Sequence, residues 1–202
     1  MFPDAGKPIY TCQAHTCDAC GISNSIHCHF GWKDLLHFYL ISIPPFLLGG
    51  SGIYRQSGWV LVIWICCLVA FFGFIEIRVM CSHCPHYAEA ERSLRCWANY
   101  GAPKLWRYRP GPMSISEKIV FFGGFMVIWG YPLLVMVVSV QWFLLLVYSM
   151  TTAGFFMTLM THWCVQCMNF ACPLNRVPMT VRDAFFTQNP TVAKAWEKTA
   201  SK

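Results

Sequence analysis

The sequence is poor in charge. Asp, Glu, Lys and Arg make up only 12% of its 202 residues, whereas hydrophobic residues make up 56% and are gathered in blocks along the chain. An ordinary soluble domain carries about twice that share of charged residues. The scarcity of charge therefore argues against a soluble core and predicts a membrane protein.

The signature motifs of several enzyme classes are also missing. The sequence contains no Gly-rich phosphate loop, no notable Ser/His/Asp order and no pair of carboxylates within an apolar segment. Hydrolase, kinase and classical transporter chemistry therefore have no support. The stretch from Met1 to Lys7 lacks the apolar region of a cleavable signal peptide, so we expect the amino terminus to stay in the mature protein.

The formal net charge of +6 points to a membrane rather than to nucleic acid. Lys and Arg lie beside the apolar blocks, mainly in residues 78–118 and in the carboxyl tail, and the opposite side offers only Arg55. The positive-inside tendency predicts that the middle loop and the tail are cytoplasmic. With four crossings the amino terminus joins them, so we expect a multi-pass protein of the cell (inner) membrane with both termini and all Cys-rich loops cytoplasmic.

Four apolar segments provide the crossings: Leu35–Gly50, Trp59–Ile77, Ile119–Val140 and Trp142–His162. A bilayer core of about 30 Å needs about 20 helical residues, and lipid leaves backbone groups no partner outside a helix. The first segment is short and contains Pro44-Pro45, so it either spans the bilayer or is re-entrant. We predict an all-α integral membrane protein, a four-transmembrane-helix bundle with a Cys-rich, metal-binding lobe on one membrane face.

The pattern divides the chain into three regions. Residues 1–34 form an amino-terminal segment rich in Cys and His, residues 35–162 hold the four transmembrane helices with a Cys-containing loop at 78–118, and residues 163–202 form a Cys-rich tail. Within this tail, Asn189-Pro190 interrupts residues 181–198 and predicts two short helices.

The 12 cysteines are grouped. Cys66 and Cys67 lie inside the second apolar segment and are expected to be packing residues. The other ten form three groups beside helix ends: Cys12, Cys17, Cys20 and Cys28; Cys81, Cys84 and Cys96; Cys164, Cys167 and Cys172. Each group contains a Cys-x-x-Cys pair, and a reducing cytoplasm disfavours disulfides, so we expect all ten to be metal ligands.

The ligand types favour an iron–sulfur cluster, with zinc as the alternative. Cys164–Pro173 resembles a bacterial ferredoxin loop that lacks its middle cysteine and needs a fourth ligand from elsewhere, such as Cys96 or a cysteine of the first group. Zinc suits mixed Cys and His sets such as Cys17, Cys20 and the His27-Cys28-His29 stretch. Ten thiols allow two four-cysteine sites with two left over, or three mixed sites. The additional candidate ligands are His27, His29, His83 and His86.

Three ionisable residues lie near the cytoplasmic ends of the apolar segments: His37, Glu76 and His162. They are candidates for a quinone or proton-transfer site, and the two histidines are candidate axial ligands of a haem b. The simpler interpretation is that each side chain reaches the lipid headgroups from a helix end.

These observations predict an iron–sulfur electron-transfer subunit that connects a cytoplasmic partner with a membrane quinone or a larger membrane complex. One alternative is a zinc-stapled membrane anchor or assembly subunit without catalysis, and another is a membrane thiol–disulfide oxidoreductase. The expected partners are membrane lipids, a partner subunit and a quinone, and no nucleic acid. Whether the protein is an enzyme stays open.

Overall fold

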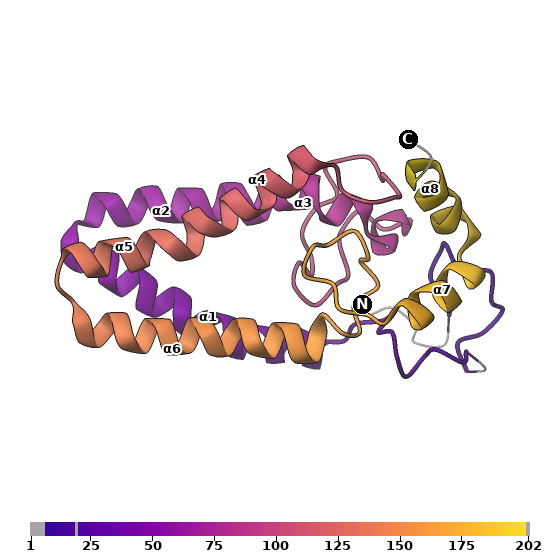
Figure 1. Ribbon diagram of the computed structural model, residues 1–202, viewed down its shortest axis with the longest axis horizontal. Coiled ribbons are helices and arrows are strands. Elements are labelled where there is room, and N and C mark those ends of the chain that lie inside the picture. Colours follow the sequence, from indigo (N-terminus) through magenta and orange to yellow (C-terminus); the bar gives the residue numbers. More distant parts are fainter. Residues whose placement is uncertain (1–6, 19, 201–202) are drawn as a thin grey trace.

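Four long apolar helical segments organise the computed structural model, which describes residues 7–18 and 20–200 (Figure 1). We call them spans, because each is long and apolar enough to cross a membrane. The first span is α1 (Trp32–Gln56), and the second consists of α2 (Gly58–Ala70), η1 (Phe71–Ile75), α3 (Glu76–Val79) and η2 (Cys81–His83). The third span consists of α4 (Ile115–Phe125), η4 (Met126–Gly130) and α5 (Tyr131–Val138). The fourth consists of α6 (Trp142–Thr158) and η5 (Leu159–Trp163). The predicted all-helical fold with four helices long and apolar enough to cross a membrane is confirmed, and the described residues include no strand. Residues 1–6, on which the signal-peptide expectation mainly rests, lie outside the described residues.

The first span is longer than the apolar segment Leu35–Gly50. Helix α1 is one continuous helix of 25 residues, from Trp32 to Gln56. Pro44 and Pro45 remove only two backbone donors, and the residues after Gly50 continue the helix. The second span begins at Gly58, so Ser57 alone separates the two helices.

Helix α1 packs closely against α5 and α6 near Gly49. A Cβ atom at Gly49 would lie 3.1 Å from the ring of Tyr148 and 3.3 Å from Pro132, which is tighter than ordinary van der Waals contact. The absent side chain lets the backbone of α1 approach α5 and α6 closely. Such tertiary contacts are not visible in the length of an apolar run.

Each of the other three spans contains one π-helical turn. In η5 the backbone N–H of Cys164 donates to the carbonyl of Leu159, five residues back, at 2.8 Å, and in η1 that of Glu76 donates to Phe71. Side chains donate hydrogen bonds to two backbone carbonyls of η4. Trp64 donates to the carbonyl of Ile128 at 3.1 Å, and Tyr148 donates to the carbonyl of Trp129 at 2.9 Å. These two side-chain donors and the carbonyls of η4 that accept from them are thereby paired inside an apolar bundle.

The two ends of the bundle differ in size (Figure 1). At one end, Ser57 and the residues Ser139–Gln141 close two short hairpin turns. The other end carries all the remaining segments, residues 7–31, 84–114 and 164–200, which we call the lobe. Its tail forms α7 (Met179–Gln188) and α8 (Pro190–Ala200), divided at Asn189 as predicted.

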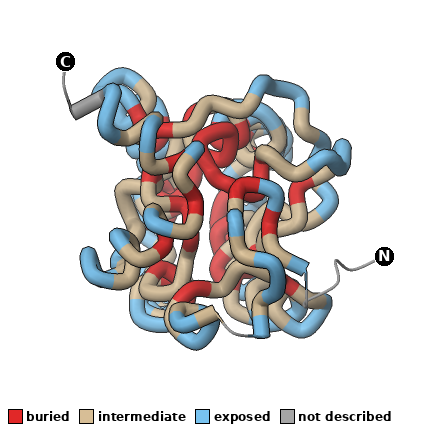
Figure 2. Tube along the Cα trace, turned by 90° about the vertical axis from the view of Figure 1, so that its right-hand side faces the viewer, coloured by how far each residue is buried: buried red, intermediate tan, exposed pale blue. Residues whose placement is uncertain are grey.

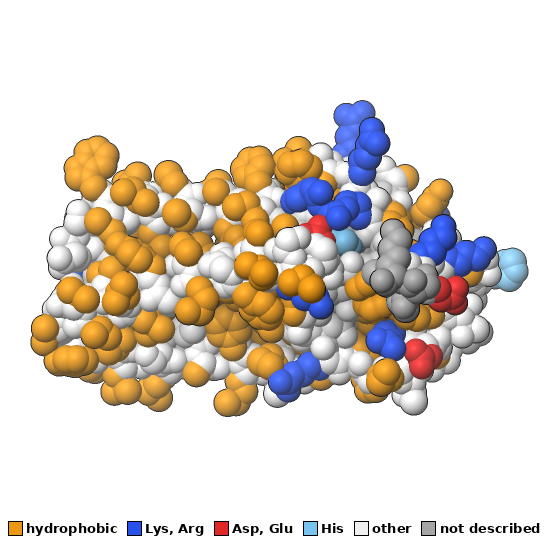
Figure 3. All heavy atoms as spheres, turned by 45° about the horizontal axis from the view of Figure 1, so that its top comes forward, with side chains coloured by type: hydrophobic (Ala, Val, Ile, Leu, Met, Phe, Trp, Pro, Cys, Tyr) orange, Lys and Arg blue, Asp and Glu red, His pale blue; other side chains and the backbone are white. Residues whose placement is uncertain are grey.

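Apolar side chains cover the outside of the spans, and Lys and Arg gather at the lobe end (Figure 3). Leu40, Ile63 and Phe143 are 62%, 64% and 81% exposed. An apolar surface of this extent is typical of a protein solvated by lipid. Buried residues concentrate in the interior, as the end-on view shows (Figure 2), and the largest buried cluster is rich in Phe and Trp.

Candidate functional site

Tight turns position the cysteines that follow the second span. After α3, the backbone N–H of Cys84 donates to the carbonyl of Cys81 at 3.0 Å, and that of Tyr87 donates to Cys84 at 2.8 Å. Pro85, which has no N–H, starts the short 3₁₀ helix η3 (Pro85–Ala88). The Cys-x-x-Cys pair therefore lies on a turn at the junction of span and lobe.

Side-chain amides position the loop that follows the fourth span. Asn175 donates to the carbonyls of Cys167 at 2.6 Å and Asn169 at 3.1 Å. Asn169 in turn donates to the carbonyl of Met80 at 3.3 Å, which ties this loop to the end of the second span. The backbone N–H of His27 donates to Gln166 at 2.9 Å and brings the amino-terminal segment alongside.

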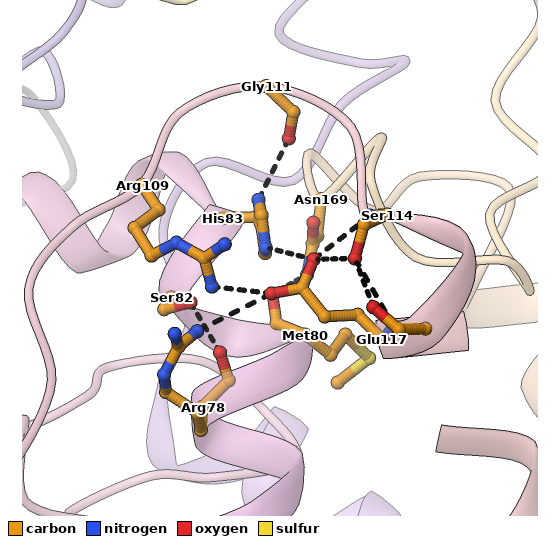
Figure 4. Close-up of polar contacts among 10 residues, drawn as sticks. Arg78, Met80, Ser82, His83, Arg109, Gly111, Ser114, Glu117 and Asn169 are labelled. Carbon is orange, nitrogen blue, oxygen red and sulfur yellow. Dashed lines mark hydrogen bonds and ion pairs between the residues drawn. The ribbon is translucent and has the colours of Figure 1, made fainter. Parts of the chain in front are cut away.

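A charged cluster around Glu117 fixes the loop between the second and third spans (Figure 4). One carboxylate oxygen accepts from Arg78 and Arg109, and the other accepts from the backbone and hydroxyl of Ser114 at 2.9 and 2.8 Å. His83 lies 3.5 Å from the same carboxylate and 3.0 Å from the carbonyl of Gly111. The candidate ligand His83 thus belongs to this cluster, which holds the base of α4 against the second span.

Six of the ten predicted ligand cysteines line one cavity of about 310 Å³ at the junction of bundle and lobe. They come from two segments far apart in sequence: Cys81, Cys84 and Cys96; Cys164, Cys167 and Cys172. Cys96, which we expected as a candidate partner of the ferredoxin-like stretch, lines the same cavity as its three thiols. The fold therefore gathers two of the three sequence groups around one space.

Asn99 links a carboxylate with two of these thiols. Its side-chain amide donates to Glu76 at 3.3 Å and to the sulfur of Cys81 at 3.3 Å, and its backbone N–H donates to the sulfur of Cys96 at 3.3 Å. Glu76 is buried and lines the cavity. Hydrogen-bond donors of this kind stabilise negative charge on a sulfur atom, both in a free thiolate and in a thiolate that binds a metal.

Three residues of the cavity wall each have a buried polar atom with no hydrogen-bond partner among the described residues. The atoms are Nε2 of His86, Oδ1 of Asn169 and Nε1 of Trp129, and each residue is more than 90% buried. Burial, helped by the neighbouring His29 and Lys104, lowers the pKa of His86 to about 3, so its ring is neutral at physiological pH. Unpartnered polar groups of this depth are rare in folded proteins and indicate a missing ligand, ion or water.

Burial disfavours ionisation of the cavity thiols that lie in the lobe. Burial raises the pKa of Cys96 and Cys167 to about 12 and that of Cys164 to about 11, and it raises the pKa of Cys84 well above the usual value. Neighbouring thiols add to the effect, since two negative charges repel each other. A bound metal cation favours the thiolate form instead, because it replaces the protons on the sulfur atoms.

The remaining four ligand candidates form a separate group on the amino-terminal segment: Cys12, Cys17, Cys20 and Cys28. The sulfur of Cys17 lies 3.6 Å from Nε2 of His29, and that of Cys20 donates to the side chain of Gln188 at 3.4 Å. All four are half-buried. Cys12 and Cys28 pack against the same apolar cluster that contains Cys84, so the two thiol groups adjoin.

In neither thiol group do three metal-binding side chains already meet at one point. Among the described residues, no three Cys, His, Asp or Glu side chains form a ready ligand set for a single ion. The six thiols of the cavity instead surround an open space. Comparisons with known protein families, with curated proteins and with solved structures find no match for this chain.

The structure separates the three ionisable residues predicted near the helix ends. Only Glu76 lines the large cavity, whereas His37 and His162 are exposed. His162 borders a small recess that also contains His27 and Asp34, whose Nε2 and Oδ2 atoms lie 3.7 Å apart. As for the cysteines expected to be packing residues, Cys66 is exposed on α2 and Cys67 is half-buried against the main core cluster.

Sequence reasoning missed the polar residues that join the thiols. Asn99 has no spacing motif, and its role appears only when the loop folds back onto α3. Asn169 lies inside the ferredoxin-like stretch but carries no metal-ligand signal of its own. The aromatic wall of the cavity was hidden too, because Phe and Trp occur throughout the apolar segments.

Proposed function

We propose that this chain is a membrane metalloprotein whose lobe holds iron–sulfur clusters and passes electrons between a soluble protein partner and an acceptor in the membrane. The observation that carries the proposal is the convergence of six cysteines, from two distant segments, on one cavity at the base of a four-helix bundle. A thiol-rich space with amide donors to sulfur suits a cluster, because clusters prefer thiolate ligands and are tuned by such hydrogen bonds.

The arrangement of the ten cysteines supports two centres. Four of the six cavity thiols suffice for one cluster, and the amino-terminal group supplies four thiols for another. Cys84 of the cavity and Cys12 and Cys28 of the amino-terminal group share an apolar cluster, so the two centres would be neighbours. A pair of adjacent centres provides a short route for electrons from the lobe surface to the bundle.

The distribution of Lys and Arg supports an orientation in the membrane with the lobe on the cytoplasmic side. Among the described residues, the far end of the bundle carries only Arg55, whereas Lys and Arg gather at the lobe end (Figure 3). With the spans in the bilayer of the cell (inner) membrane, the lobe and both termini lie in the cytoplasm. There the cysteines stay reduced and the soluble partner can reach them.

A zinc staple is the second candidate, and one contact favours it for the amino-terminal group. The 3.6 Å distance between Cys17 and His29 places imidazole beside thiol, and mixed Cys and His sets are characteristic of zinc. In that case metal binding would stabilise the lobe without electron transfer.

The decisive experiment is metal and sulfide analysis with a visible spectrum, on protein purified without oxygen. We expect iron, acid-labile sulfide and broad visible absorbance that bleaches on reduction. Colourless protein with stoichiometric zinc would replace the proposal with the zinc staple. Protein without metal but with Cys–Cys disulfides would contradict both and favour thiol–disulfide chemistry.

A further inference from the structure

The cavity does not end at the thiols but continues between the helices. All four spans contribute to this inner part: Phe38, Ser42 and Phe46; Phe72 and Glu76; Phe121, Phe125 and Trp129; Phe155 and Leu159. Phe46 and Trp129 each lie 14 residues beyond the first residue of their span, which corresponds to roughly 20 Å along a helix axis. The cavity therefore reaches well into the apolar part of the bundle.

Aromatic rings form the walls of this inner part. The centroids of Phe46 and Trp129 are 4.7 Å apart, and those of Trp129 and Phe155 are 5.1 Å apart with an angle of 23° between the planes. Phe72 meets Phe46 edge to face at 6.1 Å. Walls of this kind favour a flat, conjugated ring as occupant, through stacked and edge contacts.

The inner cavity also borders the outer surface of α1. Tyr39 and Ile43 line it, and they are 44% and 47% exposed on the face that carries the apolar surface of the bundle. A ligand that enters between the helices at this point comes from the lipid phase. Its body must therefore be lipid-soluble.

Polar groups lie at the lobe end of the aromatic part. Glu76, which accepts from Asn99 at 3.3 Å, is 5% exposed, and Ser42 on the facing helix is 4% exposed. Few but well-placed polar groups in an apolar pocket orient a ligand through its oxygen or nitrogen atoms. The occupant thus needs an apolar ring with hydrogen-bonding oxygens.

The spans are irregular where they form this cavity. The three π-helical turns contribute Phe72, Trp129 and Leu159 to its wall, and Ser42 lies just before the Pro44-Pro45 pair. Turns of this type occur frequently at functional sites. Their shared location supports a binding role for the cavity.

We propose that the inner cavity binds the ring of a lipid-soluble quinone, packed against Phe46, Trp129 and Phe155, with a ring oxygen directed at Glu76 and Asn99. Its volume, shared with the thiol part, is at the lower end of the range for small-molecule sites. The use of the quinone as electron acceptor rests on the proposed function, whereas its binding does not. The chain would then hold a metal–thiolate centre in the thiol part and a quinone in the inner part of one continuous cavity.

The test measures binding of a decyl-substituted benzoquinone to the full chain in lipid nanodiscs, by saturable quenching of tryptophan fluorescence. Ser42→Phe fills the cavity, and Ser51→Phe places the same ring on an exposed position of the same helix. We expect Ser42→Phe to weaken binding by about tenfold or more, because the added ring takes the space of the ligand. Ser51→Phe should leave the affinity unchanged.

A second variant keeps the test valid if Ser42→Phe does not fold. Glu76→Gln preserves volume and should weaken binding by about fivefold through the changed hydrogen bond. Wild-type affinity in a folded Ser42→Phe protein would overturn the inference, and if Ser42→Phe does not fold, wild-type affinity in Glu76→Gln would overturn it. Decanol that competes as well as the quinone would also overturn it, since the cavity would then hold an alkyl chain.

Iron content measured on the same samples separates this inference from the proposed function. Full iron without saturable quinone binding would refute the quinone site and leave the electron-transfer proposal standing. Saturable binding that Ser42→Phe abolishes, in protein that holds no iron, would refute the proposed function and leave the quinone site standing.

Discussion

The two thiol groups of the lobe are built in different ways. The amino-terminal group comes from one short stretch, residues 12–28, and all four of its cysteines are half-buried. The cavity group combines two loops that lie about 80 residues apart in sequence, and three of its members, Cys81, Cys84 and Cys164, are buried. The first can assemble locally, whereas the second exists only if the bundle is folded. We therefore expect different responses to mutation, chelators and pH.

The largest effect is expected from removing cavity ligands. Cys84→Ser and Cys167→Ser should each abolish metal at the cavity, because a cluster that loses one thiolate is seldom retained. Cys66→Ala, on the exposed face of α2, is the matched control and should keep the metal content of the wild type. Iron and sulfide analysis of purified protein provides the measurement. Equal metal content in all three variants would remove these ligand assignments.

Distorting the bundle should affect the cavity group but not the amino-terminal group. A Cβ atom at Gly124 would overlap the buried ring of Phe71, whereas one at Gly123 meets nothing within 4 Å. Overpacking of this kind costs about 1–3 kcal/mol, so Gly124→Ala should lower the thermal unfolding midpoint in detergent. Gly123→Ala should not.

Metal analysis of the same two variants sharpens the comparison. Loss of part of the metal in Gly124→Ala, with the remainder abolished by an added Cys17→Ser change, would show that the two groups respond separately. A parallel loss at both sites would contradict the local assembly of the amino-terminal group.

Chelator should reach the amino-terminal group first. Its four cysteines are half-buried, whereas three of the six cavity cysteines are buried. We expect loss of metal in two phases with rates that differ by about tenfold or more, the faster of which disappears in Cys20→Ser. Absorbance and metal content followed over time provide the measurement. A single phase would mean that the two sites open together.

The last prediction concerns thiol titration in metal-free protein, where the two groups differ only in how burial acts on single thiols. Burial raises the pKa of Cys96 and Cys167 to about 12, so their thiolate fraction should grow about tenfold per pH unit from pH 8 to pH 11. Alkylation rates, followed by mass spectrometry, should rise in parallel, while an exposed peptide thiol levels off above its usual pKa near 9. A plateau for Cys96 near pH 9 would contradict the buried environment.

The helices could be predicted from sequence because span length is a local property. The apolar runs indicated all four helices, although the continuation of α1 from Gly50 to Gln56 was not expected. The three cysteine groups were visible, but sequence could not decide which thiols share a space. The fold combines Cys96 with Cys164 and its neighbours, and leaves Cys17 outside. Asn99 and the phenylalanine wall depend on how loop and helices fold together, so no local pattern revealed them.

The π-helical turns have a consequence for how the spans present their faces. Each such turn closes a ring one residue larger than an α-helical turn, as the bond from Cys164 to Leu159 shows. The residues beyond it are rotated by about 100° relative to an uninterrupted helix. In the second and third spans, where helix continues on both sides of the π-helical turn, one stripe of residues therefore faces the neighbours in the far half and a different stripe faces them toward the lobe. Deleting one residue within η1 or η4 would restore a single stripe and turn one wall of the cavity away from its centre.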